Sequence, residues 1–346
     1  MSFIKKINSL GCLTKGRKEG AERRGNRGTG GPGGTAKPGA AVTTGGINSV
    51  REVQAFVKTK KILFVGFTLL LAAALLAGCG GSKEKAPAGQ QQPQQQQQQP
   101  QAPPQPAKPK LVVASDTAYA PFESLDTATG KYVGFDMDLI KAISEEMGYD
   151  EPKIESMAFD GVLGSVQTSK VDCAISAITI NDDRLKKMNF SKAYYKSGLS
   201  IVVKENNNTI KSIKDLEGKR IAVQAATTGA EMAKSIKGAK ITQFDRVTDA
   251  LLEVKKGSAD AVINDNPVNQ YYLTQETGKG LKIVGDLLSS EYYGIGVPKG
   301  KDELLKKIND ALMKLKENGK YNQIYKKWFG VDAPAELPKD YTPGGK

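Results

Sequence analysis

The chain has 346 residues, enough for about two domains at roughly 150 residues each. It carries a formal net charge of +13 and no histidine, which excludes Ser-His-Asp catalysis, Cys-His catalysis and His-ligated zinc. Its three widely separated cysteines exclude CxxC motifs and a disulfide framework. Residues 1–110 hold 17 basic and 4 acidic side chains, whereas residues 111–346 hold 33 of each. We therefore expect a neutral folded region and no nucleic-acid partner.

The first 56 residues do not look like a folded domain. Twelve glycines fall within the first 50 positions, and no apolar period is sustained. Such a segment buries too little surface to offset the entropy of ordering it. Residues 1–56 are therefore predicted to be a disordered or wrongly assigned leader. We hypothesise that translation begins at Val57, directly before a short lysine cluster.

A signal peptide is predicted over residues 57–78. Three lysines precede a run of 16 uncharged residues, 62–77. A spanning helix needs about 20 apolar residues, so this run fits a signal-peptide core better. It ends in Leu76-Ala77-Gly78-Cys79, which resembles a bacterial lipobox. That resemblance implies cleavage before Cys79, a lipid (palmitate) anchor on Cys79, and a place on the extracytoplasmic face of the cell membrane. An uncleaved membrane anchor with an incidental cysteine is the alternative.

A tether is predicted over residues 79–109. Eleven glutamines and six prolines lie between Pro87 and Pro106. Polar tracts rich in proline stay extended and solvated. The segment is either a spacer that holds a domain away from the membrane or neutral low-complexity sequence, and both interpretations predict disorder.

Short apolar strands alternate with amphipathic helices from residue 110 onward, which predicts an α/β architecture. We expect Cys173 to be a small buried side chain within this region. The expected strands are 111–114, 173–177, 220–223, 241–244 and 260–263, and the expected helices are 138–147, 229–236, 247–255, 302–318 and 321–328.

Polar residues follow three of these strands, where open α/β sheets bind ligands. Asp182 is a predicted N-cap with Arg184 in the first helical turn, and Thr228 begins a predicted capping box with Glu231. Free amides at helix N-termini and the Arg184 fork favour a carboxylate. Asp265 adds a lone acid, so the set matches a zwitterionic amino acid. Each feature also has a plain structural interpretation, since Asp265 could be only an N-cap before a first-turn proline.

The order of these motifs resembles the polar amino-acid binding proteins of bacterial ABC importers, which have the two-lobed type II periplasmic-binding-protein fold (family 3 solute-binding proteins). The likeness covers residues 110–331. The matching stretches are 116–123, 133–138, 178–184, 190–195, 222–229, 260–267, 292–294 and 318–330.

The resemblance implies a role for each matching position. Arg184 would hold the ligand α-carboxylate, helped by Thr179 and the backbone of Thr227 and Thr228. Asp265 and the Ala177 carbonyl would hold the α-ammonium. Aromatic walls would come from Tyr119 and Phe159, and Asp116 would meet the polar end of the ligand side chain. Without the resemblance, we would interpret Tyr119 and Phe159 as hydrophobic core residues and Asp116 as a residue that caps a turn.

Gln224 bears on ligand choice. Glutamine-preferring relatives carry a lysine at this position, and a lysine would repel a cationic ligand. The neutral Gln224 leaves Asp116 as the nearest charge, a pattern that favours arginine, lysine or histidine. We therefore expect a basic amino acid, with glutamine as the alternative.

The resemblance also implies the domain arrangement and the mechanism. Lobe one comprises residues 110–198 and 292–335, lobe two comprises 199–291, and 336–346 form a tail. Hinge strands are expected near 200–204 and 289–293. Ligand capture would close the lobes, and the closed monomer would deliver its cargo to an ABC transporter permease. We expect no cofactor, no metal and no enzymatic activity. A dehydratase-like enzyme, or an amino-acid sensor with a membrane segment and signalling domain after the lobes, are the alternatives on the same fold.

Overall fold

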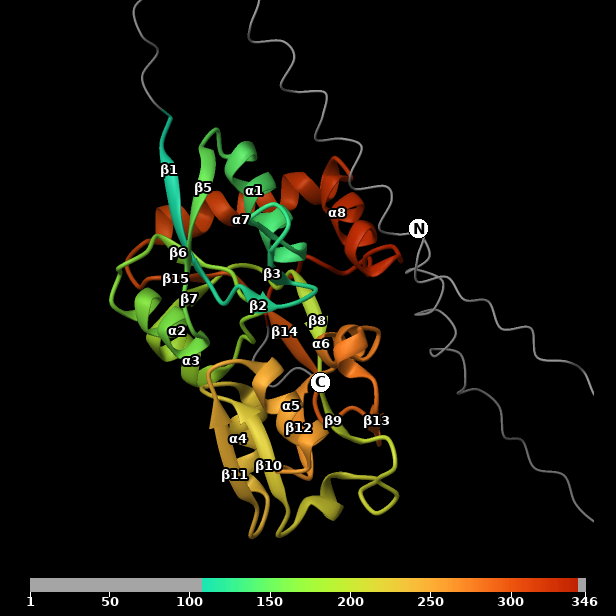
Figure 1. Cartoon of the computed structure of the whole chain (residues 1–346). Helices are drawn as coiled ribbons and strands as arrows, with labels where there is room; N and C mark the ends of the chain where they lie inside the picture. The colour runs from blue at the N-terminus through green and yellow to red at the C-terminus, as the bar shows by residue number, and fades with distance from the viewer. Residues whose placement is uncertain (1–107, 342–346) are drawn as a thin grey trace, which may run out of the picture. The chain divides into compact units, whose positions relative to one another are not determined.

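A computed structural model describes residues 108–341 (Figure 1). The predicted leader, the signal peptide, Cys79 and the tether up to residue 107 lie outside the described residues, as do residues 342–346. The described part contains two five-stranded sheets, each flanked by helices. The α/β two-lobed prediction is therefore confirmed.

Lobe one is built on the sheet of order β5-β1-β6-β15-β7. Strand β1 pairs in parallel with β5 and β6, while β15 runs antiparallel to β6 and β7. The three-stranded sheet β2-β3-β4 belongs to the same lobe. The strands are β1 Lys110–Ser115, β2 Ala118–Tyr119, β3 Glu123–Asp126, β4 Lys131–Val133, β5 Asp150–Ser156, β6 Cys173–Ala174, β7 Asn189–Phe190 and β15 Gly296–Val297.

Helices cover the lobe-one sheet because each has one apolar face. In α1 (Phe135–Glu146), Leu139, Ile140 and Ile143 are fully buried. The long α7 (Asp302–Glu317) buries Ile308, Leu312 and Leu315 in the same hydrophobic core as α1. These apolar residues recur with the period of a helix. The remaining helices of this lobe are α2 Phe159–Gln167, α3 Asp182–Lys187 and α8 Lys320–Phe329.

Lobe two is built on the sheet of order β11-β10-β12-β9-β13. Strand β10 is parallel to β11 and β12, and β9 is antiparallel to β12 and β13. Its elements are β9 Leu199–Lys204, β10 Arg220–Gln224, β11 Lys240–Phe244, β12 Ala261–Asp265, β13 Leu281–Val284, α4 Thr228–Ser235, α5 Val247–Lys256, α6 Asn266–Leu273 and the 3₁₀ turns η2 Ile213–Leu216 and η3 Glu276–Gly278.

An antiparallel pair, β8 (Tyr195–Ser197) and β14 (Glu291–Tyr293), connects the two sheets, and we call it the hinge pair (Figure 1). The hinge prediction was wrong for 200–204. These residues lie in β9, which is buried between β12 and β13 and is thus a core strand of lobe two. The two chain segments that link the lobes, one after β8 and one before β14, approach each other closely at Gly198. A Cβ at Gly198 would lie 2.3 Å from the Ser289 carbonyl oxygen.

Aromatic rings hold the hinge pair against lobe one. Tyr195 of β8 stacks on Tyr293 of β14 with ring centroids 5.5 Å apart. Phe122 meets Tyr195 edge-on at 4.9 Å, and Phe329 of α8 packs on Tyr195 at the same distance. Aromatic pairs of this geometry add about 0.5–1.5 kcal/mol each beyond buried area. The lobe-one end of the hinge pair is therefore firmly anchored.

Most sequence-predicted elements match the structure to within a few residues. Several elements were missed, mostly short strands, and the longest of them are β5 and α2. Strand β5 reads DEPKIES and pairs only with β1, so as an edge strand it has little apolar content to reveal it. Helix α2 contains Gly161 and Gly164, which weaken its sequence signal. Cys173 is fully buried in β6, as expected, but the strand ends at Ala174 rather than Ala177.

The described part of the predicted tail packs on lobe one. Leu337 is buried, and the backbone N–H of Lys339 donates to the Ala193 carbonyl at 3.1 Å, with the reverse bond at 2.6 Å. Within residues 108–341, no helix combines the length and apolar character needed to cross a membrane.

Candidate functional site

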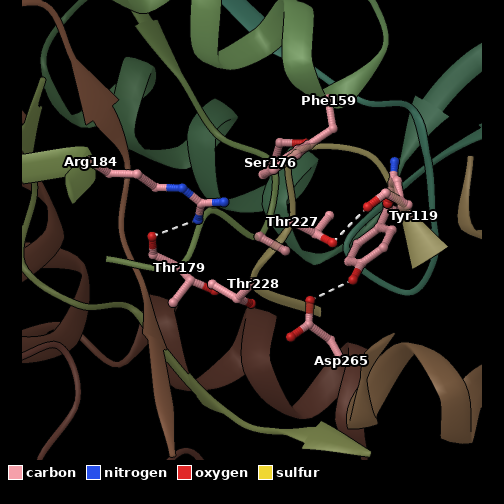
Figure 2. A pocket seen from close by; sticks show the side chains of 10 residues that line it. Tyr119, Phe159, Ser176, Thr179, Arg184, Thr227, Thr228 and Asp265 are labelled. Atoms are coloured by element: carbon pink, nitrogen blue, oxygen red, sulfur yellow. Dashed lines mark hydrogen bonds between the residues drawn. The ribbon is translucent and has the colours of Figure 1, made fainter. Parts of the chain in front are cut away.

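A small, nearly filled cavity lies where the carboxyl ends of β6, β10 and β12 meet, between the lobes. Figure 2 shows side chains from both lobes pointing into this space. The cavity is lined by Tyr119, Phe159, Ser176, Ala177, Thr179, Arg184, Gln224, Thr227, Thr228 and Asp265. The structure thus brings together every predicted ligand-binding residue except Asp116, which lies behind Gln224.

Arg184 enters the cavity from α3. The N-cap of this helix is Asn181, whose Oδ1 accepts the Arg184 backbone N–H at 2.9 Å. The prediction that Asp182 is the cap was therefore wrong by one residue, because Asp182 already lies within α3. The guanidinium donates to the carbonyls of Thr179 at 2.8 Å and Ala226 at 3.0 Å.

The surroundings of the Arg184 guanidinium stabilise its charge without a salt bridge. It lies 5.3 Å from the centre of the Phe159 ring, a cation–π contact. Burial lowers its pKa, while the charges of nearby carboxylates, Glu231 first, oppose that shift. Arginine keeps its proton in proteins regardless. Among the described residues Arg184 forms no salt bridge, so a positive charge faces the cavity.

Helix α4 begins at the cavity in lobe two. Its N-cap is Thr227, whose Oγ1 accepts the Ala230 N–H at 3.1 Å. The predicted cap, Thr228, is instead the first helical residue, so its hydroxyl is free for other partners. Gly229 allows the helix to approach β12, since a Cβ there would lie 2.6 Å from the Ile263 carbonyl. The first amides of α4 and its dipole favour an anion near Arg184.

Asp265 ends β12 and supplies the negative charge. It is the N-cap residue of α6, but its side chain forms no capping bond. Its Oδ2 accepts the Tyr119 hydroxyl at 2.5 Å, and its Oδ1 is buried with no donor among the described residues. Burial, followed by the Glu291 charge, raises the Asp265 pKa to about 7. A buried acceptor without a donor is costly, so this oxygen suits an incoming N–H group.

Tyr119 and Phe159 both contact the site rather than only the core. The Tyr119 hydroxyl has two acceptors within reach, Asp265 Oδ2 at 2.5 Å and Asn264 Oδ1 at 2.8 Å, which share its one proton. Its side chain therefore crosses from lobe one to lobe two (Figure 2). Phe159 is 8% exposed and covers Arg184.

The turn of Ser176 and Ala177 rests on two buried acids. Ala177 has a φ of 45°, a strained conformation for a residue with a Cβ. Its N–H donates to Asp136 at 2.8 Å, and the Ser176 hydroxyl donates to Glu123 at 2.7 Å. Burial raises the pKa of both acids, that of Asp136 to about 6. Ser176 lines the cavity and was missed, because the sequence places it inside an apolar strand.

Asp116 is buried next to the cavity rather than in its lining. Its Oδ2 accepts the Gln224 Nε2 at 2.6 Å, and Gln224 also donates to the Asp245 carbonyl at 3.0 Å. Burial raises the pKa of Asp116, while the Gln224 hydrogen bond opposes this shift. The two residues join lobe one to lobe two at this end of the cavity.

Glu291 is the second residue that the sequence did not point to. It is 8% exposed on β14, and its Oε2 accepts the hydroxyls of Thr179 at 2.7 Å and Thr228 at 3.0 Å. Its position in a predicted crossover strand, after two serines, gave no chemical signal. Residues 108–341 contain no group of three Cys, Asp or Glu side chains placed to hold a metal.

The arrangement suits a small zwitterion. A buried guanidinium and a helix N-terminus lie at one side of the cavity, and a buried carboxylate with an unpaired oxygen lies at another. Figure 2 shows Arg184 and Asp265 reaching into the same space. Opposite charges fixed in this way can hold a carboxylate and an ammonium of one molecule.

Comparison with known proteins gives consistent matches. The family described as bacterial extracellular solute-binding proteins, family 3, matches residues 111–331. The ABC transporter glutamine-binding protein GlnH of Bacillus subtilis is 31% identical over 281 residues, which cover 80% of this chain and 100% of that protein.

Two solved structures are also similar. The arginine-, lysine-, histidine-binding protein ArtJ from Geobacillus stearothermophilus shares 39% identity with a TM-score of 0.62, covering 66% of this chain and 98% of that one. An ancestral arginine-binding protein bound to glutamine shares 42% identity with a TM-score of 0.60, covering 64% and 98%.

Proposed function

Because this chain belongs to the bacterial extracellular solute-binding proteins of family 3, we propose that it captures a polar amino acid outside the cytoplasm and delivers it to an ABC importer. The relatives named above bind glutamine or basic amino acids. The function is capture and release, with no covalent step.

One observation carries this proposal: Arg184 and Asp265 present opposite charges in one buried cavity. Arg184 has no carboxylate partner, and Asp265 Oδ1 has no donor, among the described residues. An α-amino acid supplies the two missing groups at once, a carboxylate for Arg184 and the α4 amides, and an ammonium for Asp265 and the Ala177 carbonyl. Tyr119 and Phe159 would flank its side chain.

We propose that the cargo side chain is basic, as in arginine or lysine, with glutamine as the second candidate. The end of the cavity at Gln224 has a neutral amide backed by the buried Asp116 carboxylate. A cationic side chain would be attracted by Asp116, and a glutamine amide could exchange hydrogen bonds with Gln224. The ancestral arginine-binding protein bound to glutamine supports the view that one scaffold can hold both.

A thermal-shift screen of the purified protein against the twenty amino acids tests the function. A ligand at 100 times its Kd stabilises the folded state by about 2.7 kcal/mol, so a true ligand will stand out. We expect arginine or lysine to give the largest shift. No shift with any amino acid would refute the proposed function.

The Gln224→Lys substitution separates the two ligand classes. A lysine there would pair with Asp116 and repel a cationic side chain. We expect arginine affinity measured by calorimetry to fall at least about tenfold, while glutamine affinity changes less, since charged contacts of this kind are worth more than 1.4 kcal/mol. Equal losses for both ligands would argue against a cationic side chain at this end.

We also propose the lobe assignment 110–198 with 292–335 and 199–291, and closure about the hinge pair when the ligand contacts both lobes. A ligand that touches both lobes favours the closed state by its differential contacts. The closed monomer would dock on the permease.

A lipid anchor on Cys79 completes the proposal. The lipobox-like sequence supports it, although it lies outside the described residues. Cells labelled with a palmitate analogue should yield a labelled protein in the membrane fraction. The Cys79→Ser variant should be unlabelled, and labelling of that variant would contradict the assignment.

A further inference from the structure

Glu291 occupies an unusual position for a buried acid. It lies on β14 of the hinge pair, between the lobes, and is 8% exposed. Its Oε2 accepts one hydroxyl from each lobe: Thr179 at 2.7 Å from lobe one and Thr228 at 3.0 Å from lobe two. Both threonines line the cavity. One carboxylate oxygen thus joins the hinge to both walls of the site.

The carboxylate itself is held in place by the neighbouring turn. Its Oε1 accepts the Ser289 hydroxyl at 2.9 Å, and Ser289 Oγ in turn accepts the Leu199 N–H at 3.0 Å. Leu199 begins β9 of lobe two. The orientation of Glu291 is therefore fixed from both connections of the hinge.

This geometry determines the direction of the threonine hydroxyls. A hydroxyl has one proton to donate, and a carboxylate can only accept. Thr179 and Thr228 therefore direct their protons at Glu291 and present lone pairs to any further partner. In that state neither hydroxyl can donate to a ligand carboxylate, and both can accept N–H groups.

We propose that Glu291 is a positioning residue that sets the two threonine hydroxyls as acceptors for the ligand ammonium, and so selects cargo with an α-amino group. The inference rests on the amino-acid binding proposed above and deepens it. Ligand carboxylate recognition then falls to Arg184 and backbone amides, and the hydroxyls add to Asp265 on the ammonium side.

Calorimetry with L-arginine and L-glutamine tests this in the full-length protein. Loss of two oriented hydrogen-bond acceptors predicts about tenfold weaker binding in Glu291→Ala. Glu291→Gln keeps an oxygen that can accept both hydroxyls and should stay within about threefold of wild type. The exposed Glu303→Ala serves as the control and should bind as wild type does.

A double-mutant cycle shows whether Glu291 acts through the threonines. In a Thr179→Val, Thr228→Val background, Glu291→Ala should weaken binding by less than about twofold further. If Glu291→Ala does not fold, Ser289→Ala replaces it in the cycle, because it removes the hydroxyl that holds Oε1. Ser289→Ala should weaken ligand binding in the wild-type protein and should have no such effect in the Thr179→Val, Thr228→Val background.

Several outcomes would overturn the inference. Equal losses in Glu291→Gln and Glu291→Ala would show that charge, not hydroxyl direction, is responsible. The inference would also be overturned if Glu291→Ala weakened binding as much in the Thr179→Val, Thr228→Val background as in the wild-type background, or did not weaken it in either. The proposed function would stand in both cases. A wild-type protein that binds neither amino acid would overturn both.

Discussion

Among the charged side chains of the site, we expect Arg184 to contribute most to the affinity for the ligand. It is 7% exposed and anchored by two carbonyls, so its position is set before a ligand arrives. Preorganised groups lose little on binding, and a buried charge contact is worth about 2–5 kcal/mol when one partner is truncated.

Arg184→Ala should therefore weaken amino-acid binding at least about 100-fold in calorimetry. Arg184→Lys keeps the charge but loses the planar fork, so an intermediate loss is expected. Arg220→Ala is the matched control, because Arg220 pairs with Asp260 at a partly exposed position on lobe two. An affinity unchanged in Arg184→Ala would remove Arg184 from the site.

The Asp265 carboxyl predicts a pH dependence of affinity. Its pKa is raised to about 7 by burial and by the Glu291 charge, and Tyr119, Tyr293 and Arg184 oppose the shift. An ammonium requires the ionised form, so protonation below pH 7 competes with binding. Affinity for glutamine should be constant above pH 7 and fall about tenfold per pH unit below it.

Calorimetry between pH 5 and 8 measures this slope, and proton release below pH 7 should appear as a dependence on buffer ionisation enthalpy. Asp265→Asn should bind more weakly and lose the slope. A slope that persists in Asp265→Asn would assign the titration to another group, such as Asp116, whose pKa is also raised by burial.

At the scale of elements, sequence patterns located most of the longer strands and helices, but they missed α2 and the apolar strand β13. They also placed Arg184, Thr227 and Asp265 at the ends of strands that converge. They failed where tertiary pairing decides the structure. β5 is polar and exists because β1 pairs with it, and Asn181 rather than Asp182 caps α3 because backbone geometry selects one of two equivalent capping residues.

The same limit explains Ser176 and Glu291. Ser176 lies in an apolar stretch, and Glu291 lies more than 60 residues from either threonine it contacts. No local pattern predicts a contact across such a distance. Asp116 shows the reverse case, since the resemblance placed it in the pocket and the structure places Gln224 in front of it.

The crossing of the hinge connections predicts a second element-level effect. A methyl group at position 198 would collide with the Ser289 carbonyl, 2.3 Å from the Cβ position. Gly198→Ala should destabilise the fold by about 1–3 kcal/mol and weaken ligand binding, because it separates the connections next to Glu291. Thermal unfolding and calorimetry measure both.

Gly164→Ala provides the comparison. Gly164 lies inside α2 with nothing within 4 Å of its Cβ position, so alanine there should stabilise the protein by about 0.5–1 kcal/mol. A Gly198→Ala protein as stable as wild type, with full affinity, would show that the hinge connections adjust freely.

At the scale of the folded region, the two lobes should respond to ligand as units. Ligand contacts on both lobes favour closure, so the radius of gyration from small-angle scattering should decrease when arginine or glutamine is added. The Arg184→Ala protein at the same ligand concentration should show no decrease. An unchanged radius in a wild-type protein that binds ligand would mean that the lobes do not move on binding.

Side chains at the site join the lobes by hydrogen bonds: Tyr119 to Asp265 and Asn264, Gln224 to Asp116, and Arg184 to the Ala226 carbonyl. Loading is then an exchange reaction, in which a solute replaces protein partners with its own. A molecule with only one of the two charges cannot replace all of these protein partners. Without an ammonium group, for example, it leaves Asp265 Oδ1 without a donor. An importer that responds to tight closure would thus hydrolyse little ATP on solutes it should not carry.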